Sequence, residues 1–356
     1  MIMVAVSFQD PQATLLGEQP ERWEPVLKLA CKKCEYQARA DEPNNGFKEC
    51  WGELAQVRPH LLDFFRLSNL RPPGGKDPVT ILTSEGNANL MDVPKEWLSG
   101  AYAPRQSLQL DYTSPVREYL SSDLRAILES HDYPLHFIDF EASRISLPYH
   151  EGMSPYQQMT FQWSCHSIES PGGTIEHHEW INLKHAFPNF EFARALRDVL
   201  GDRGTIYIFS HFEQTALRDI RSQMDSRGYE DTDLANWLEA LGDSKNPRVV
   251  DMEKLVRTHH FHPRMGGRTS IKAVLPAVWE NDESLWEHPL FSRFFRRGSD
   301  GRVVDPYKTL KPLPIDGLGE EFGVVEEGTA AIRRLLKYPD PARMGFSERA
   351  ESVKVR

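Results

Sequence analysis

Apolar and polar residues alternate regularly only from about residue 131 onward, where the pattern predicts strands and helices in turn. Residues 157–168 place aromatic residues and Cys165 between polar neighbours, and this period of two is typical of a half-buried strand. Residues 188–200 instead repeat apolar side chains at helical spacing and end at Gly201, a common helix terminator. The pattern therefore predicts an α/β domain.

The expected elements follow one another in a definite order along this domain. They are strands at 133–141, 157–168 and 174–183, a helix at 188–200, a strand at 205–209, a helix from about 212, and a helix at 231–241. This is the order of the RNase H-like fold, in which three antiparallel strands join parallel ones, although other α/β folds share it. We expect an α/β, RNase H-like mixed sheet flanked by helices, with a small cysteine-containing N-terminal region.

The pattern divides the rest of the chain into two further regions. Residues 1–65 contain three of the four cysteines, and the helical spacing of HLLDFFRLSNL at 60–70 predicts a helix at their end. Residues 66–130 contain turn-forming residues and short amphipathic segments, so we expect a connector with short helices. Residues 131–356 would then form the RNase H-like exonuclease-type domain.

Composition narrows the class of protein without naming its function. The net charge of −10 argues against general electrostatic coating of nucleic acid, although a local basic patch could still bind phosphates. No apolar run approaches the roughly 18 residues that a membrane span requires, and the N-terminus lacks the pattern of a signal peptide. We expect a cytoplasmic protein without a membrane partner, and the sequence does not indicate its oligomeric state.

Four acidic residues lie within or just after short apolar runs in the predicted domain. Asp139 and Glu141 lie two positions apart on one strand and so share a face, while Glu213 and Asp251 each come just after another apolar run. Neighbouring carboxylates repel one another unless a cation neutralises them, and proteins hold Mg²⁺ or Mn²⁺ in this way. For an isolated Asp-x-Glu pair a solvated strand edge is the commoner explanation. Three such runs in one domain favour a site for Mg²⁺ or Mn²⁺.

Several motifs resemble those of the DEDD 3′–5′ exonucleases. Asp139-Phe140-Glu141 resembles their first motif, Ser210-His211-Phe212-Glu213 the second with Glu in place of Asp, and Val250-Asp251 the segment that follows. Six blocks resemble, more closely, an uncharacterised bacterial family related to these exonucleases: FIDFE, PYQQMTFQWSCH, IYIFSHFE, VVDMEKL, HPRMGGRTSIKAVLPA and DPYKTL. The resemblance implies phosphodiester hydrolysis from a 3′ end with two Mg²⁺ or Mn²⁺ ions. Asp139, Glu141 and Glu213 would be metal ligands, and Asp251 a lesser catalytic candidate.

The resemblance is incomplete at its C-terminal end. The family's catalytic set closes with an Asp four or five residues after a Tyr or His, and Tyr338-Pro339-Asp340 has the wrong spacing. We therefore expect either a truncated chain or a lost acid. A catalytically incomplete module that binds nucleic acid or a partner is the alternative to an exonuclease.

Further residues are candidates for contact with nucleic acid, DNA rather than RNA. A Gly-Gly turn before a helix start exposes backbone N–H groups that can bind phosphate, and basic residues flank it. A capped helix after a tight turn explains the same residues equally well. The candidates are Tyr156, Gln157, His211, Arg264, Gly266, Gly267, Arg268, Ser270 and Lys272.

The N-terminal cysteines predict a separate metal centre. Cys31-x-x-Cys34, with Cys50 sixteen residues later, is typical of thiolates that hold a metal or cluster. The pattern resembles the cluster end of iron–sulfur PD-(D/E)XK nucleases, which implies a [4Fe-4S] cluster whose fourth cysteine lies upstream. Zinc with a His or water ligand is the competing interpretation. If these cysteines are the residues that matter most for function, the chain is a cluster-dependent structural or redox protein. Cys165 is expected to be a buried core residue.

Overall fold

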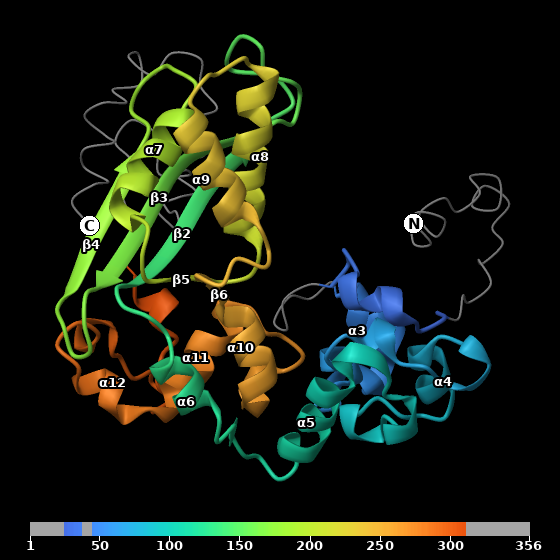
Figure 1. Ribbon diagram of the computed structural model, residues 1–356. Coiled ribbons are helices and arrows are strands. Elements are labelled where there is room, and N and C mark those ends of the chain that lie inside the picture. The colour runs from blue at the N-terminus through green and yellow to red at the C-terminus, as the bar shows by residue number, and fades with distance from the viewer. Residues whose placement is uncertain (1–24, 38–44, 311–356) are drawn as a thin grey trace, which may run out of the picture. The chain divides into compact units, whose positions relative to one another are not determined.

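The computed structural model describes residues 25–37 and 45–310 (Figure 1). They form two compact units. Unit 1 comprises the described residues up to Tyr119 together with Phe261–Arg268, and unit 2 comprises Leu120–His260 and the described residues from Thr269 onward. The Tyr338-Pro339-Asp340 segment lies outside the described residues.

Unit 2 is built on a five-stranded mixed sheet with the order β4-β3-β2-β5-β6. The strands are β2 (Leu135–Arg144), β3 (Gln158–Ile168), β4 (Ile175–Ile181), β5 (Thr205–Ile208) and β6 (Val249–Asp251). The first three pair antiparallel, and β2, β5 and β6 pair parallel. The predicted fold class, a mixed α/β sheet flanked by helices, is confirmed, and the strand order joins three antiparallel strands to two parallel ones as expected.

Three helices contribute to the core of unit 2: α7 (Asn189–Leu200), α8 (Phe212–Ser226) and α9 (Thr232–Gly242). In Figure 1, α7 lies along β3 and β4, α8 packs on β2 and β3, and α9 runs beside α8. Every second residue of the two long strands points into this core, including Ile138, Phe140 and Trp163. Cys165 is fully buried among them, as predicted.

One of the remaining helices of unit 2 precedes β2 in the chain and three follow β6. They are α6 (Leu124–Glu129), α10 (Met252–His259), α11 (Ile271–Asn281) and α12 (Glu283–Glu287), with short 3-10 turns at Ser292–Phe294 and Pro306–Thr309. The helix α10 begins directly where β6 ends, at Asp251. This connection places an acidic residue at the carboxyl end of a parallel strand.

Gly204 is required where β5 begins beside β2. Its φ is +82°, and a Cβ added there would lie 2.2 Å from the carbonyl oxygen of Pro134, which accepts a hydrogen bond from the Thr205 N–H. Gly172 has a similar φ of +72° but open space around it. A side chain at Gly172 would therefore introduce backbone strain without steric overlap.

We expect Gly204→Ala to lower the stability of unit 2 by about 1–3 kcal/mol more than Gly172→Ala does, because only Gly204 adds steric overlap to the cost of positive φ. Denaturant unfolding of both variants measures the difference. Equal destabilisation would show that the approach to Pro134 is not a tight one.

Unit 1 is helical and contains many single 3-10 turns. Its α-helices are α3 (Gly46–Trp51), α4 (Pro78–Ser84) and α5 (Ala103–Thr113). The turns span Leu29–Lys33, Gly52–Gln56, Leu61–Asp63, Leu67–Asn69, Pro73–Gly75, Leu90–Asp92, Lys95–Trp97, Gly100–Tyr102 and Pro263–Met265. A single apolar core contains residues from Phe47 to Leu110.

The prediction of a helix at 60–70 is wrong. Two 3-10 turns occupy this stretch, Phe64 between them is extended, and Arg66 is left-handed with φ 48°. Side chains of α5 bind the backbone there, because Gln109 accepts from the Phe65 N–H at 2.7 Å and Gln106 donates to the Phe65 carbonyl at 3.1 Å. These side chains provide the partners that a helix would otherwise supply, so helical spacing occurs without a helix.

A separate two-stranded sheet pairs β1 (Tyr119–Leu120) with β7 (His260–Phe261). None of the helices in the described ranges combines the length and the apolar composition needed to cross a membrane.

Candidate functional site

The acidic residues gather where the parallel strands of unit 2 end. In the register of the sheet, Phe137 pairs with Tyr207, and Ile208 at the end of β5 pairs with Asp251 at the end of β6. Asp139 lies two residues beyond Phe137 on β2. Glu213 lies on the first turn of α8, the helix that follows β5. Three neighbouring parallel strands thus deliver acids to one edge of the sheet.

Asp139 and Glu141 project from the sheet face opposite the core. Asp139 is exposed and Glu141 half-buried, while the residues between and before them, Phe140 and Ile138, are buried. The strand register shifts between Glu141 and Ala142, so a bulge follows the pair directly. Bulges bend a strand locally and re-aim side chains, and they are common next to active sites. The alternation expected for this strand is present.

Glu213 is the most unusual carboxyl of the site. Its side chain is only 3% exposed, and its Oε2 has no hydrogen-bond partner among the described residues. Burial raises the pKa of Glu213 to about 8, and the negative charges of Asp139 and Asp251 act in the same direction. A buried, unpartnered acid oxygen near two other carboxylates is the arrangement that a cation would stabilise.

Asp251 has a structural role at this edge. Its Oδ1 accepts hydrogen bonds from the Ser210 N–H at 2.9 Å and from the Glu253 N–H at 2.9 Å. The first bond fixes the turn before α8, where Ser210 has a left-handed φ of 77°, and the second caps α10. Asp251 therefore holds the turn that leads to Glu213, in addition to its charge.

The donor set suits a hard divalent cation, since carboxylate oxygens are what Mg²⁺ and Mn²⁺ prefer. Asp139, Glu141 and Glu213 could supply it, and the orphaned Oε2 of Glu213 supports this fit. In the described part of the chain, however, no three His, Cys, Asp or Glu side chains are already arranged to hold a metal ion. The carboxylates converge on one edge without forming a closed coordination shell.

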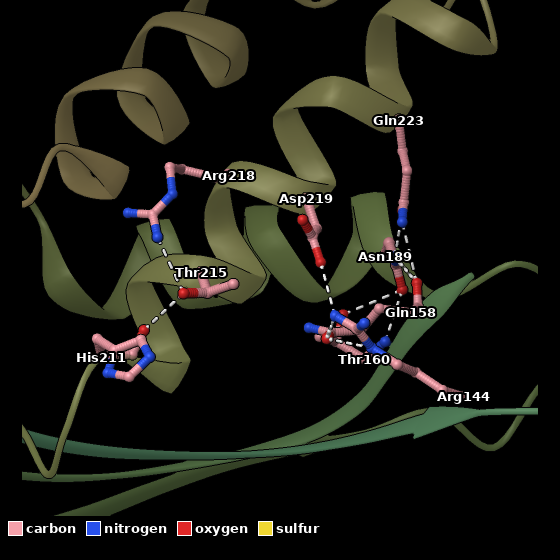
Figure 2. A network of polar contacts seen from close by, with 9 residues as sticks. All are labelled: Arg144, Gln158, Thr160, Asn189, His211, Thr215, Arg218, Asp219 and Gln223. Atoms are coloured by element: carbon pink, nitrogen blue, oxygen red, sulfur yellow. Dashed lines mark hydrogen bonds and ion pairs between the residues drawn. The ribbon is translucent and has the colours of Figure 1, made fainter. Parts of the chain in front are cut away.

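A buried polar network fixes α8, and with it Glu213, against the sheet (Figure 2). Asn189 at the start of α7 is fully buried and accepts from the Thr160 N–H at 2.8 Å and its hydroxyl at 3.0 Å. Its amide donates to the Gln158 carbonyl at 3.1 Å and to the Gln223 side chain on α8. The Gln223 amide also donates to the Gln158 carbonyl, at 3.0 Å.

An ion pair at the end of β2 adds to this network. Arg144 donates to the Gln158 side chain at 2.6 Å and pairs with Asp219 of α8 at 3.1 Å (Figure 2). Neither Arg144 nor the buried amides were among the residues expected from the sequence. The position of Arg144, three residues after Glu141 on the same strand, was the one indication that could have pointed to it.

His211, at the head of α8, is exposed and is held through its backbone. Its carbonyl accepts the Thr215 hydroxyl at 2.9 Å, and the Thr215 hydroxyl accepts from Arg218 at 2.9 Å (Figure 2). Arg218 also donates to the Gly242 carbonyl of α9 at 2.7 Å. The His211 ring is 3.3 Å from the Ser210 hydroxyl. The imidazole thus lies at the same helix end as Glu213.

Tyr156 and Gln157 lie at the edge of the sheet that contains the acids. Arg144 at the end of β2 pairs with Gln158 at the start of β3, so both residues come just beyond the carboxyl end of β2. Tyr156 is 65% exposed and left-handed, with φ 59°. Gln157 instead accepts from the Ser154 N–H at 2.8 Å and orders the preceding turn.

The Gly-Gly block divides between the two units. Gly266 and Gly267 belong to unit 1, where a Cβ on Gly267 would lie 2.1 Å from the Asp63 carbonyl oxygen. Close packing of this turn on the chain at Asp63 thus explains a glycine there. Arg264 and Arg268 of the same segment are exposed.

Ser270 and Lys272 belong to unit 2 and begin α11, where both are exposed. Ser270 occupies the N-cap position without a side-chain capping bond. The block is therefore one structural turn followed by an exposed helix start.

The three N-terminal cysteines lie near one another in unit 1. Cys31 is in the 3-10 turn Leu29–Lys33, Cys34 caps that turn, and Cys50 is on α3. Burial raises the pKa of the Cys50 thiol, and the neighbouring Cys34 and Cys31 raise it further. All three are free thiols, and no closed metal-binding group of three residues forms within the described ranges.

Fold and site together define unit 2 as a mixed α/β domain with an acidic site at one edge of its sheet. Residues 136–270 match the family model described as Domain of unknown function (DUF2779), and all four acids lie inside this match. Comparisons with curated proteins and with solved structures gave no match.

Proposed function

We propose that the acidic edge of unit 2 is a divalent-cation site for phosphodiester hydrolysis, in a 3′–5′ exonuclease that acts on nucleic acid, DNA in preference to RNA. The observation that carries this proposal is Glu213, a buried carboxyl without a partner for its Oε2, whose pKa is raised to about 8 beside Asp139 and Asp251. Carboxyls whose pKa is shifted this far cluster at functional sites, and a bound cation would offset the cost of burying the charged form. The motif resemblance to DEDD exonucleases supplies the reaction type.

In this proposal each acid has a distinct part. Asp139 and Glu141 face outward on one side of β2 and would hold Mg²⁺ or Mn²⁺ together with Glu213. The bound ions would neutralise the charge that develops on the phosphate and its leaving oxygen. Asp251 would keep the Ser210 turn, and so the head of α8, in position through its backbone hydrogen bonds.

The neighbouring exposed groups fit a single-stranded substrate. Tyr156 offers a ring at the sheet edge on which an unpaired base could stack, a contact worth about 1–3 kcal/mol per base. His211 lies exposed at the head of α8 and could donate to a phosphate oxygen. Neither contact requires pairing of the bases, which agrees with action at a strand end.

The test is degradation of end-labelled single strands by the full chain in the presence of Mn²⁺. We expect shortening from the 3′ end, and a loss of at least about a hundredfold on Asp139→Asn, because that change removes one charge from the cation site. Asp198→Asn, an exposed aspartate on α7, is the matched control. Degradation that survives Asp139→Asn, or that needs no divalent ion, would sink the proposal.

A module that binds nucleic acid without cleaving it is the second candidate. The observation in its favour is that no closed three-residue metal set exists among the described residues. It predicts that labelled strands bind and are not shortened, and that Tyr156→Ala weakens binding while Asp139→Asn does not.

We also propose that Cys31, Cys34 and Cys50 hold an iron–sulfur cluster or zinc. The support is their mutual proximity, seen in the effect of Cys31 and Cys34 on the pKa of Cys50. Metal analysis after anaerobic purification tests this: one equivalent of zinc, or iron with sulfide, should be lost on Cys50→Ser. Cys165→Ser, a buried thiol of unit 2, is expected to retain it.

A further inference from the structure

Two histidines face each other across strands β3 and β4. His166 and His177 are directly paired in the register, and the His166 Nε2 lies 3.1 Å from the His177 Nδ1. Their ring centroids are 4.5 Å apart, and both side chains are exposed. They lie on the sheet face that carries Asp139, since His166 also pairs with Phe137, two residues before that acid. This pair has no part in the proposed hydrolysis.

The distance between the two nitrogens is that of two ligands on one metal ion. With metal–nitrogen bonds of about 2.0–2.1 Å, two nitrogens lie about 2.9 Å apart at a right angle and about 3.4 Å apart at a tetrahedral angle. The observed 3.1 Å falls between these values. For a metal ion to replace the proton between the two rings, the rings would have to reorient. The strands could stay where they are.

The second nitrogen of His177 has the partner that metal-bound histidines usually have. Its Nε2 lies 3.5 Å from a carboxylate oxygen of Glu179, two residues along the same strand. A carboxylate behind a histidine fixes the ring orientation and increases its basicity as a ligand.

We propose that His166 and His177 form a two-imidazole site for a divalent transition-metal ion such as Ni²⁺ or Zn²⁺, with Glu179 as the outer carboxylate. Imidazole ligands favour such ions, whereas the carboxylates at Asp139 favour Mg²⁺ or Mn²⁺. Water completes the coordination, in agreement with the absence of a three-residue set from the described ranges. The site would fasten the edge strand β4 to β3.

Calorimetric titration of Ni²⁺ into the full chain, with Mg²⁺ in excess, tests this site. We expect one binding event to be lost on His166→Gln and on His177→Gln, and to weaken about tenfold on Glu179→Gln. His178→Gln is the matched control, because that imidazole is next in sequence, lies on the other face of the strand and is 3.7 Å from Glu176.

Any Ni²⁺ that the cysteines bind would be bound equally by all these variants. Its signal can therefore be told apart from that of the histidine pair. Asp139→Asn should leave the event intact, so its outcome is independent of the proposed exonuclease. Isotherms of His166→Gln and His177→Gln that equal the wild type would overturn the site. Loss of the event on His178→Gln would do the same.

Discussion

Glu213→Gln is expected to make the protein more stable at about pH 8 and to change little at about pH 5. The carboxyl is buried without a partner for Oε2 among the described residues, and its pKa is raised from 4.5 to about 8. The folded state therefore binds this proton more tightly than the unfolded state does. Its contribution to stability is complete below the unfolded pKa and is lost as the pH rises toward 8.

The size of this effect follows from the shift. Between the two pKa values the wild type loses at most about 1.4 kcal/mol per pH unit relative to Glu213→Gln, or about 4 kcal/mol from pH 5 to pH 8. Chemical denaturation at a series of pH values measures it. Glu239→Gln, an exposed glutamate on α9, is the control and should follow the wild type. If the stability of the wild type and of Glu213→Gln changed with pH in parallel, burial would not raise the pKa of this carboxyl.

Mn²⁺ is expected to raise the stability of the wild type near pH 8, which the ionisation of Glu213 lowers. A cation beside Glu213 favours the carboxylate, so saturating Mn²⁺ should restore stability near pH 8 in the wild type and much less in Glu213→Gln. The stability measurement thereby tests whether the buried acid belongs to the proposed cation site.

Asn189→Ala is expected to destabilise unit 2 by about 2–4 kcal/mol, because it leaves several buried groups without partners. The Thr160 N–H and the Gln223 amide oxygen both lose a hydrogen bond to Asn189, which is itself fully buried. Asp219→Ala removes a partly exposed member of the same network and should cost less than about 1 kcal/mol.

Urea unfolding of the two variants provides the comparison. Asn189→Ala should also reduce the proposed exonuclease activity more than its stability alone explains, since Gln223 connects the network to α8. A cost for Asn189→Ala no greater than that for Asp219→Ala would contradict the role of the buried amides.

The sheet of unit 2 could be predicted from the sequence because its strands and helices have clear periods. The strand at 157–168 is observed at Gln158–Ile168, and the helix at 188–200 is observed at Asn189–Leu200. Both elements bury one face, so period and burial agree. Asp139 and Glu141 share a face for the same reason.

Other features depend on contacts between distant residues and were not predictable from local pattern. The helix expected at 60–70 is absent because Gln106 and Gln109 of α5 bind the backbone there. The close packing of Gly267 on Asp63, more than two hundred residues away, accounts for a glycine at this position.

The same limit applies within the site. The burial of Glu213 depends on how α8 packs on the sheet, which no local pattern shows. Asn189, which looks like an ordinary helix start, is buried and donates a hydrogen bond to Gln223 of this helix. The sequence indicated which acids lie near one another, and the structure identifies the one among them that is buried.

The most direct test of the central claim is calorimetric titration of Mn²⁺ into the full chain at about pH 8, close to the raised pKa of Glu213. The wild type and Asp198→Asn should show the same saturable binding, and Asp139→Asn should bind at least about tenfold more weakly. If Asp139→Asn binds Mn²⁺ as the wild type does, the acidic edge of the sheet is not a cation site.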